Sequence, residues 1–357
     1  MPRSDTSLLA AYPGGRICVV LLSGIGDVVH GLPLANDLKR NDPRRSIVWV
    51  AEPAPAEVLR HHPAVDEIVV FRKSSGLAGI RQLRWDLRQL RCDIALNMQR
   101  YFKGVFPALF SRARVRVGLP PSKTRDGVTW FNTHHLPEQP WRHTQDIFLD
   151  YRKVLGLPED ATVEYRITFS AAEVVERCDF FARVGGGPVA GVVLGSANRA
   201  KDWPAERYPA LVDALQEELG YRVLLIGGPS TAEREAAERI ANESRTRPLS
   251  GLGDSVRRMM WMTGGVDLLI SPDTGPLHIA HALGTPVVGL FGHTNPWRVG
   301  PYRHYHDLII DRYTEPGDPP DSSGYEPKND RMERISVADV LEKVAIARER
   351  YPKKARS

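Results

Sequence analysis

Short apolar runs alternate with longer mixed stretches along most of the chain. In the first half, apolar runs occur at residues 16–22, 46–52, 67–71, 93–99 and 114–119. The stretches between the first four runs are long enough to hold helices, and strands joined by crossover helices form parallel sheets. The pattern therefore predicts an α/β fold with a parallel sheet in this half.

The second half repeats the alternation. Its apolar runs occur at residues 189–195, 221–228, 266–272 and 286–292. Between the two series, a helical stretch near 171–183 ends in the sequence VGGGPV, which is typical of a hinge. We therefore expect two Rossmann-like domains that face each other across a cleft, with ligands bound at the carboxyl ends of the strands.

The two series also predict the domain boundaries. We expect an N-terminal Rossmann-like domain at 1–170, a linker at 171–187 and a C-terminal Rossmann-like domain at 188–330. Residues 331–357 contain an amphipathic helix, which we expect to pack back towards the N-terminal domain. Residues 314–331 are rich in Pro, Gly and Ser and are expected to form a loop.

Composition narrows the class of protein. Hydrophobic residues make up 42% of the chain and charged residues 25%, as in ordinary globular proteins. The three cysteines have unrelated spacings, which fit neither a disulfide framework nor a zinc site and favour a cytoplasmic location. No apolar stretch approaches the roughly 20 residues that a membrane-spanning helix needs. The apolar segment near the start is also too short for a signal peptide.

The net charge of the chain is compatible with an anionic ligand or partner but does not identify it. The net charge is +5, and the stretch LAGIRQLRWDLRQLR places Arg81, Arg84, Arg88 and Arg91 on one helical arc. A basic amphipathic helix of this kind can lie on an anionic lipid surface. Charged helix faces usually face water, which favours the interpretation that these arginines do so here. Both interpretations stay open.

A glycine-containing helix start in the second half is the strongest local motif. In SPDTGPLHIAHALG, Asp273 or Thr274 can cap a helix, Pro276 suits its first turn and Gly284 is placed to end it. The backbone N–H groups of the Asp273–Gly275 loop would then lie at the positive end of the helix, where they suit a pyrophosphate. A capped helix with no ligand is the alternative.

Two further strand ends carry matching chemistry. Ser196 and Lys201 follow one strand, where a hydroxyl and a cation suit a phosphate. Glu233 follows another, where a carboxylate suits ribose hydroxyls or simply stabilises a helix N-terminus. The three strand ends together indicate a nucleotide-diphosphate site.

The stretch LLSGIGDVVHGLP places an acid, Asp27, on a glycine turn at the start of a helix. A carboxylate there repels phosphate, so Asp27 either caps the helix or performs chemistry. A dinucleotide fingerprint would need glycine at position 29, which is Val29, although Glu52 resembles its ribose-binding acid. No phosphate-binding GxxxxGK[ST] motif is present. His278 and His281 lack the HExxH pattern of a zinc site.

Taken together, GIGDVVHGLP, GSANRAKDWP, GGPSTAERE and SPDTGPLHIAHALGTPVVGLFG resemble the heptosyltransferase family, which builds the inner core of lipopolysaccharide from ADP-heptose. The similarity extends from Arg16 to about Tyr302 and into the last helix. It implies the GT-B architecture, with the acceptor bound by the N-terminal half and the nucleotide sugar by the C-terminal half. It further implies transfer with inversion of the anomeric centre, without a metal or other cofactor.

The resemblance also implies roles for individual residues. Asp27 matches the family's general base. Donor binding falls to Ser196, Lys201, Glu233, Asp273, Thr274, Gly275 and His278. Acceptor binding falls to Gly26 and His30, with Arg100, Lys103, Arg142 and His143 as further candidates for acceptor phosphates or carboxylates. The implied partners are a nucleotide sugar and a lipid-linked saccharide at the cytoplasmic face of the inner membrane, with no nucleic acid.

Two departures from the family pattern keep other functions open. Ala197 replaces a hydroxyl that the family often has beside Ser196. Leu21 and Leu22 stand where relatives often carry a Lys or Arg associated with the phosphorylated acceptor. The alternatives are a GT-B transferase for another sugar or for a protein acceptor, and a non-catalytic nucleotide-binding protein.

Overall fold

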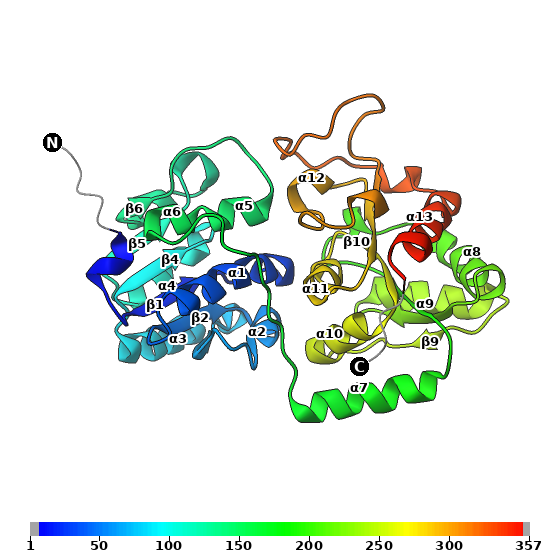
Figure 1. The fold of residues 1–357 in the computed structure, drawn as a ribbon, viewed down its shortest axis with the longest axis horizontal. Helices are drawn as coiled ribbons and strands as arrows, with labels where there is room; N and C mark the ends of the chain where they lie inside the picture. The colour runs from blue at the N-terminus through cyan, green and yellow to red at the C-terminus, as the bar shows by residue number, and fades with distance from the viewer. Residues whose placement is uncertain (1–6, 353–357) are drawn as a thin grey trace. The chain divides into compact units, whose positions relative to one another are not determined.

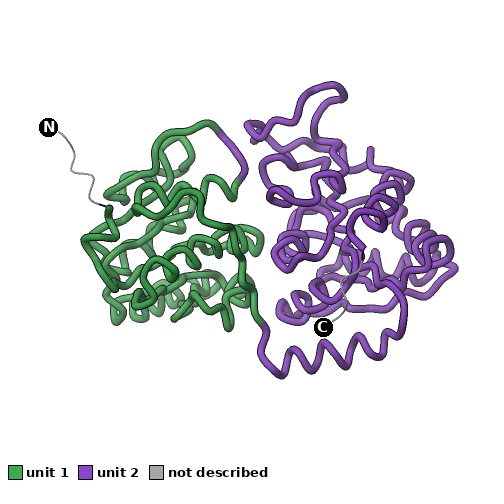
Figure 2. The backbone as a smooth tube through the Cα atoms, in the orientation of Figure 1, with its two compact units in different colours: residues 1–140, 144–168 green, residues 141–143, 169–357 purple. Residues whose placement is uncertain are grey.

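The computed structural model describes residues 7–352. The chain divides into two compact units, residues 1–140 with 144–168 and residues 141–143 with 169–357 (Figure 2). Each unit contains one six-stranded sheet (Figure 1). No helix in the described part of the chain is both long and apolar enough to cross a membrane.

The sheet of the first unit is parallel, in the order β3-β2-β1-β4-β5-β6. Its strands are β1 (Arg16–Val20), β2 (Ser46–Ala51), β3 (Glu67–Val70), β4 (Ile94–Asn97), β5 (Val115–Gly118) and β6 (His134–His135). The α-helices of this unit are α1 (Ile25–Asn41), α2 (Pro53–Leu59), α3 (Gly76–Leu90), α4 (Val105–Phe110), α5 (Thr144–Leu149) and α6 (Tyr151–Leu155). The central strands β1 and β4 are almost wholly buried apolar runs, as expected for strands covered on both faces.

The sheet of the second unit has the equivalent order, β12-β11-β10-β7-β8-β9, and is also parallel. Its strands are β7 (Val189–Val193), β8 (Arg222–Ile226), β9 (Leu249–Ser250), β10 (Leu268–Pro272), β11 (Val287–Phe291) and β12 (Ile309–Asp311). The α-helices are α7 (Ala171–Val184), α8 (Tyr208–Asp213), α9 (Thr231–Glu243), α10 (Val256–Gly265), α11 (Gly275–Leu283), α12 (Pro296–Val299) and α13 (Val337–Arg350).

Both sheets have the Rossmann strand order, in which the chain moves outward first to one side and then to the other. The predicted α/β class with two Rossmann-like sheets is therefore confirmed. All nine predicted strands are present. The strands β6, β9 and β12, which the apolar runs did not predict, contain only two or three residues and lie at sheet edges.

The last helix was expected to pack back towards the N-terminal domain, and its buried face packs within the second unit. Helix α13 belongs to the second unit, where Val340, Val344 and Ala347 are buried in that unit's core together with Trp203. Trp203 Nε1 also donates a hydrogen bond to the carbonyl of Ile335, 2.9 Å away, just before the helix. The apolar face of α13 therefore packs against the sheet of the second unit.

The segment expected as a linker is mostly helix α7, which also belongs to the second unit. Phe181 and Val184 pack into the second unit's core. Arg257 of α10 donates to both carboxylate oxygens of Glu173, at 2.6 and 2.7 Å, and these contacts lower the pKa of Glu173 to about 2. Helix α7 therefore contacts the second unit through Glu173 near its start and through Phe181 and Val184 near its end.

Replacing Arg257 with Met tests this attachment. We expect the free energy of unfolding to fall by about 2 kcal/mol at neutral pH, because the pair is largely shielded from water. Since the pKa of Glu173 is depressed when folded, its stabilisation is complete above its ordinary pKa of 4.5 and is lost as the pH falls toward 2. The difference from wild type in urea denaturation should shrink over that range. Arg239→Met, at an exposed pair with Glu243, serves as the control, and an equal effect there would contradict the assignment.

Candidate functional site: two strand-end clusters

The chain reverses direction across the second sheet between β7 and β10. These strands are hydrogen-bonded neighbours, but β7 leads to β8 on one side and β10 leads to β11 on the other. Loops that leave such neighbouring strands in opposite directions open a crevice at their carboxyl ends. The loop after β7 carries Ser196 and Lys201, and the loop after β10 carries Asp273, Thr274 and Gly275. Predicted donor residues from two distant segments thus meet at one point of the fold.

An ion pair between a buried carboxylate and a partly exposed lysine joins these two loops. Lys201 Nζ lies 2.7 Å from Asp273 Oδ2, and Asp273 is only 6% exposed. Thr294, in the loop after β11, donates to the same carboxylate oxygen from 2.7 Å, and His278 Nε2 lies 3.3 Å from the other oxygen. Burial alone would raise the pKa of the Asp273 carboxyl, but Lys201 and His278 hold it well below its ordinary value. Asp273 is therefore ionised.

The contacts assign different tasks to Asp273 and Lys201. The Asp273 carboxylate is surrounded by donors from Lys201, His278 and Thr294, and as an anion it would repel a diphosphate. Its effect on an anionic ligand is therefore to position Lys201. One ammonium proton points to Asp273, which leaves two for a ligand. Thr294 is a residue that the sequence patterns missed, although the adjacent strand end of β11 was predicted.

The start of helix α11 adds a backbone donor to this cluster. Thr274 is the N-cap residue in extended conformation and makes no side-chain cap hydrogen bond, and Pro276 lies in the first turn. Gly284 ends the helix with φ +75°, in the left-handed region that glycine adopts readily. The predicted first-turn proline and terminating glycine are therefore confirmed, and Thr274 takes the predicted N-cap position without the side-chain cap hydrogen bond. Pro276 has no N–H and the Leu277 N–H donates to the Thr274 carbonyl at 3.1 Å, so the first-turn donor that suits an anion is the Gly275 N–H, at the positive end of the helix.

Ser196 has a different environment from the one expected. Its hydroxyl lies 2.7 Å from both the carbonyl oxygen of Asn198 and Oδ1 of Asp202, and it accepts from the N–H of Asn198. Burial raises the pKa of the Asp202 carboxyl. Ser196 thus shapes the turn that presents Lys201. A direct contact with phosphate stays a prediction.

Glu233 connects the loops after β7 and β8. It occupies the third position of α9, where it accepts from the N–H of Gly228 at 2.7 Å and from the hydroxyl of Ser230 at 2.5 Å. Ser230 accepts in return from the Glu233 N–H, which completes a capping box. A Cβ on Gly195 would lie 2.8 Å from Glu233 Cγ, so glycine is needed where the two loops meet. The helix-stabilising role is therefore present, and ribose contact stays a prediction.

The first unit has its own reversal point, between β1 and β4. Asp27 follows β1, but it is not the N-cap of α1, so that alternative is wrong. The N-cap is Gly24, and Asp27 lies at the third helical position, where its Oδ2 accepts from the Gly24 N–H at 2.9 Å. Gly26 lies beside it in the same turn. Asp27 and Gly26 are both partly exposed.

Two cations from the loop after β4 accompany Asp27. Lys103 donates to the Ser23 hydroxyl and, at 3.1 Å, to Oε1 of Glu52. Glu52 is thus the partner of a lysine in this structure. Arg100 Nε donates to the carbonyl of Lys123 at 3.0 Å. Burial lowers the pKa of the Arg100 guanidinium, while the nearby charge of Asp27 acts in the opposite direction.

Two histidines predicted to bind the acceptor are buried instead. His30 is 3% exposed, with Nδ1 3.1 Å from Oε1 of Gln145, whose amide donates back to the His30 carbonyl. His143 donates to the carbonyl of Gly300 at 2.9 Å and is grouped, with Arg142, in the second unit. These contacts give both rings structural roles and do not support their predicted acceptor contacts. Acceptor binding by Arg142 stays a prediction.

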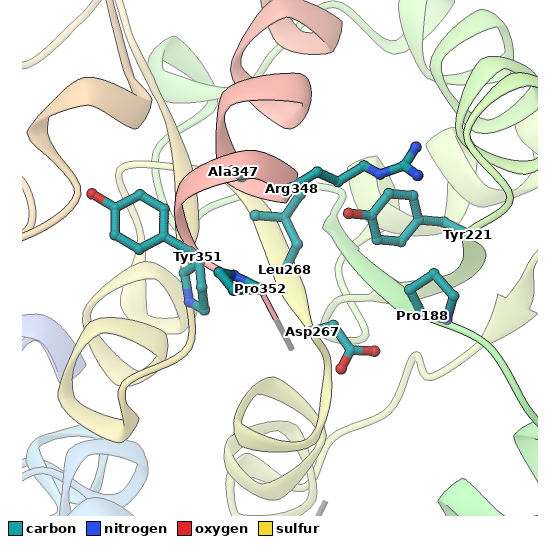
Figure 3. Close-up of a pocket in the computed structure, with 9 residues that line it drawn as sticks. Pro188, Tyr221, Asp267, Leu268, Ala347, Arg348, Tyr351 and Pro352 are labelled. Carbon is teal, nitrogen blue, oxygen red and sulfur yellow. The ribbon is translucent and has the colours of Figure 1, made fainter. Parts of the chain in front are cut away.

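A pocket in the second unit lies at the opposite end of the strands (Figure 3). Pro188, Asp267 and Pro286 line it, and each immediately precedes one of the strands β7, β10 and β11. Tyr351, just after α13, lines it from another side. This pocket is therefore separate from the carboxyl-end cluster of Lys201 and Asp273. Within residues 7–352, no group of three or more His, Cys, Asp or Glu side chains is arranged to hold a metal ion.

Comparison with known proteins extends this picture. The family model of glycosyltransferase family 9 (heptosyltransferase) matches residues 80–316. The lipopolysaccharide core heptosyltransferase OpsX of Haemophilus influenzae is 26% identical over 84% of this chain and 85% of its own length. Lipopolysaccharide heptosyltransferase 1 of Escherichia coli is 26% identical over 80% of this chain and 91% of its own length.

Solved structures agree on the fold. A family 9 glycosyltransferase from Veillonella parvula superposes with a TM-score of 0.79, at 23% identity, over 94% of this chain and 97% of its own. The ADP-heptose lipopolysaccharide heptosyltransferase II of Escherichia coli superposes with a TM-score of 0.72, at 22% identity, over 93% and 98%. Two Rossmann-like units of this kind constitute the GT-B fold.

Proposed function

The chain belongs to glycosyltransferase family 9, the heptosyltransferase family, and we propose on that basis that it transfers a heptose from ADP-heptose to a lipid-linked, anionic sugar of the lipopolysaccharide inner core. The curated relatives with matching length are lipopolysaccharide heptosyltransferases. One of the superposed proteins is named for its ADP-heptose substrate. We further propose that the enzyme acts in the cytoplasm, at the cytoplasmic face of the inner membrane.

The cluster of Lys201, Asp273 and the first turn of α11 carries the donor assignment. A diphosphate needs concentrated positive charge that does not have to be reorganised on binding. Lys201 supplies a full charge, and its geometry is set by the buried Asp273 carboxylate. The Gly275 N–H at the start of α11 supplies a partial charge beside it. In the proposed reaction these groups neutralise the leaving ADP, so that the transfer needs no metal.

Asp27 is the proposed general base. Its carboxylate would take the proton from the acceptor hydroxyl while that oxygen forms a bond to the anomeric carbon of the heptose. The bond from that carbon to the diphosphate oxygen breaks at the same time, and ADP departs with the electron pair. A single displacement inverts the anomeric centre. The N–H of Gly24 holds the carboxylate in one orientation, and glycine leaves room for the acceptor.

Arg100 and Lys103 are the proposed acceptor cations. Both follow β4, whose carboxyl end adjoins that of β1, and the charge of Asp27 acts on Arg100. Lys103 already contacts Ser23, in the turn that precedes Asp27. These residues would supply the positive charge that Leu21 and Leu22 do not.

A pair of variants separates the two roles of Glu233. Glu233→Gln is expected to weaken ADP binding about tenfold, because a charged acceptor for ribose hydroxyls becomes neutral. Ser230→Ala removes the other half of the capping box, so it should cost about 1 kcal/mol of stability without changing ADP affinity. Calorimetric titration and thermal denaturation of both variants measure these effects. Equal ADP affinity in wild type and Glu233→Gln would restrict Glu233 to the helix cap.

Nucleotide selectivity tests the donor assignment directly. We expect calorimetry on the purified chain to show ADP binding at least about tenfold tighter than UDP, since 1.4 kcal/mol of base-specific contact suffices. ADP should also bind more tightly than NAD, whose diphosphate carries an additional nicotinamide riboside. A preference for UDP would indicate another sugar donor. A preference for NAD would overturn the glycosyl donor site altogether.

A further inference from the structure

Positive charge is concentrated in one part of the first unit. Residues 72–131 contain thirteen lysines and arginines but only three aspartates and no glutamate, which gives this segment a net charge of +10. The whole chain carries +5, so the remaining residues together are net negative. A polarised distribution of this kind directs one face of a protein towards an anionic partner.

Helix α3 (labelled in Figure 1), within this segment, has an outer face that carries both arginines and exposed apolar side chains. Its Leu83 and Leu87 are buried against the unit. On the outside, Leu77 is 73% exposed and Trp85 is 65% exposed. Arg81 lies four residues from each, so the three side chains share one stripe of the helix. Large apolar groups standing among cations are the pattern of interfacial membrane helices.

In the part of the chain that the structure describes, the arginines of α3 and its C-cap residue Arg91 have no polar side-chain partner. Among residues 7–352, the side chains of Arg81, Arg84, Arg88 and Arg91 make no ion pair or hydrogen bond. Asp86, the acid on this helix, accepts instead from Gln82 at 2.7 Å. By contrast, the arginines that organise the two units, such as Arg152 and Arg257, each contact a carboxylate. The α3 arginines therefore remain available to an external anion.

The neighbouring elements extend this surface. Helix α4 contacts both α3 and the short turn η5 (Val128–Phe131). Leu109 of α4 is 40% exposed and Trp130 of η5 is 85% exposed. Exposed tryptophans on a basic surface are typical of the boundary between lipid headgroups and acyl chains.

We propose that the outer face of α3, together with Leu109 and Trp130, docks on an anionic lipid bilayer. Trp85 and Leu77 enter the headgroup region, and Arg81, Arg84 and Arg88 contact lipid phosphates. This docking rests on the proposed function, because a lipid-linked acceptor lies on such a surface. Exposed leucine and tryptophan side chains gain from burial among acyl chains, whereas a nucleic acid backbone offers Leu77 nothing comparable.

The test is co-sedimentation of the full chain with phosphatidylcholine vesicles, with and without phosphatidylglycerol. We expect binding to the anionic vesicles only, with a steep loss as salt is added. Each basic residue at an anionic membrane surface contributes about fivefold to partitioning, so R81Q/R84Q/R88Q should bind about a hundredfold more weakly. R183Q/R239Q/R247Q removes the same charge from exposed positions of the second unit and should bind like wild type. Trp85→Ser should weaken binding with the arginines intact.

The outcomes that overturn the proposal are distinct. Equal binding of both triple variants would show a dependence on net charge alone, and equal binding to neutral vesicles would remove the role of the arginines. Binding to duplex DNA without binding to vesicles would replace the membrane by a nucleic acid. Transfer to a soluble, lipid-free acceptor should be unchanged in R81Q/R84Q/R88Q. If the wild-type protein did not transfer heptose to the soluble acceptor, the proposed function would be contradicted. The vesicle co-sedimentation result would still test membrane docking independently.

Discussion

Asp27→Asn is expected to lower kcat for heptose transfer by about 10²–10⁴-fold, the range over which a general base contributes to a proton-transfer step. The substitution removes basicity while keeping an oxygen that can accept from the Gly24 N–H. The start of α1 should therefore stay intact, with a change in stability below about 1 kcal/mol. ADP affinity should be unchanged, because the proposed nucleotide site lies in the other unit. Steady-state kinetics and calorimetry of the same preparation measure both quantities.

The chain offers a matched control for this substitution. Asp339 occupies the third position of α13 and accepts from the Ser336 N–H at 2.8 Å, which is the same local task that Asp27 performs for α1. Asp339 also pairs with Arg312 at 2.8 Å, so Asp339→Asn should lower stability at least as much as Asp27→Asn while leaving kcat unchanged. Near-normal turnover in Asp27→Asn would restrict Asp27 to its structural role at the helix start.

Lys201→Met is expected to cost both donor affinity and stability. A charge-assisted contact to the diphosphate is worth about 1.5–3 kcal/mol, so ADP should bind about ten- to hundredfold more weakly. The variant also leaves the Asp273 carboxylate buried without its cation, and an uncompensated buried charge costs about 3 kcal/mol. Lys39→Met is the control, because its partner Asp66 is 42% exposed and that pair lies in the first unit.

The stability loss in Lys201→Met should depend on pH. In wild type the folded pKa of Asp273 is depressed, so its contribution is present above the ordinary aspartate pKa of about 4 and is lost below it. Without Lys201, burial raises that pKa and the carboxyl takes up a proton more readily when folded. The difference between variant and wild type in urea denaturation should therefore be largest near neutral pH and shrink on acidification. A deficit independent of pH would show that Asp273 is not the group left unpaired.

The periodicity of the sequence predicts most of the fold. Continuous apolar runs such as 189–193 identify buried parallel strands, whereas β6 and β9, with two residues each, have no period to detect. An amphipathic pattern also shows that α13 buries one face without showing which sheet receives it. The burial of Val340 and Val344 in the second unit is a long-range fact of packing.

The candidate site was predicted as residue types at strand ends, and its contacts needed the topology. Lys201 and Asp273 are 72 residues apart, and only the strand order that makes β7 and β10 neighbours brings them together. Thr294 was missed because a single threonine after a strand carries no pattern. Aspartate is a preferred N-cap residue, which made Asp27 a candidate cap for α1. The N-cap is Gly24 instead, and Asp27, at the third helical position, accepts a hydrogen bond from the Gly24 N–H.

The most direct test of the account is a transfer assay with purified chain, ADP-heptose and a panel of truncated lipopolysaccharide acceptors. We expect an acceptor heavier by one heptose, release of ADP, inversion at the anomeric carbon, and activity in the presence of a metal chelator. Product formation from a UDP-sugar in place of ADP-heptose, or ADP binding without transfer to any acceptor of the panel, would contradict this expectation.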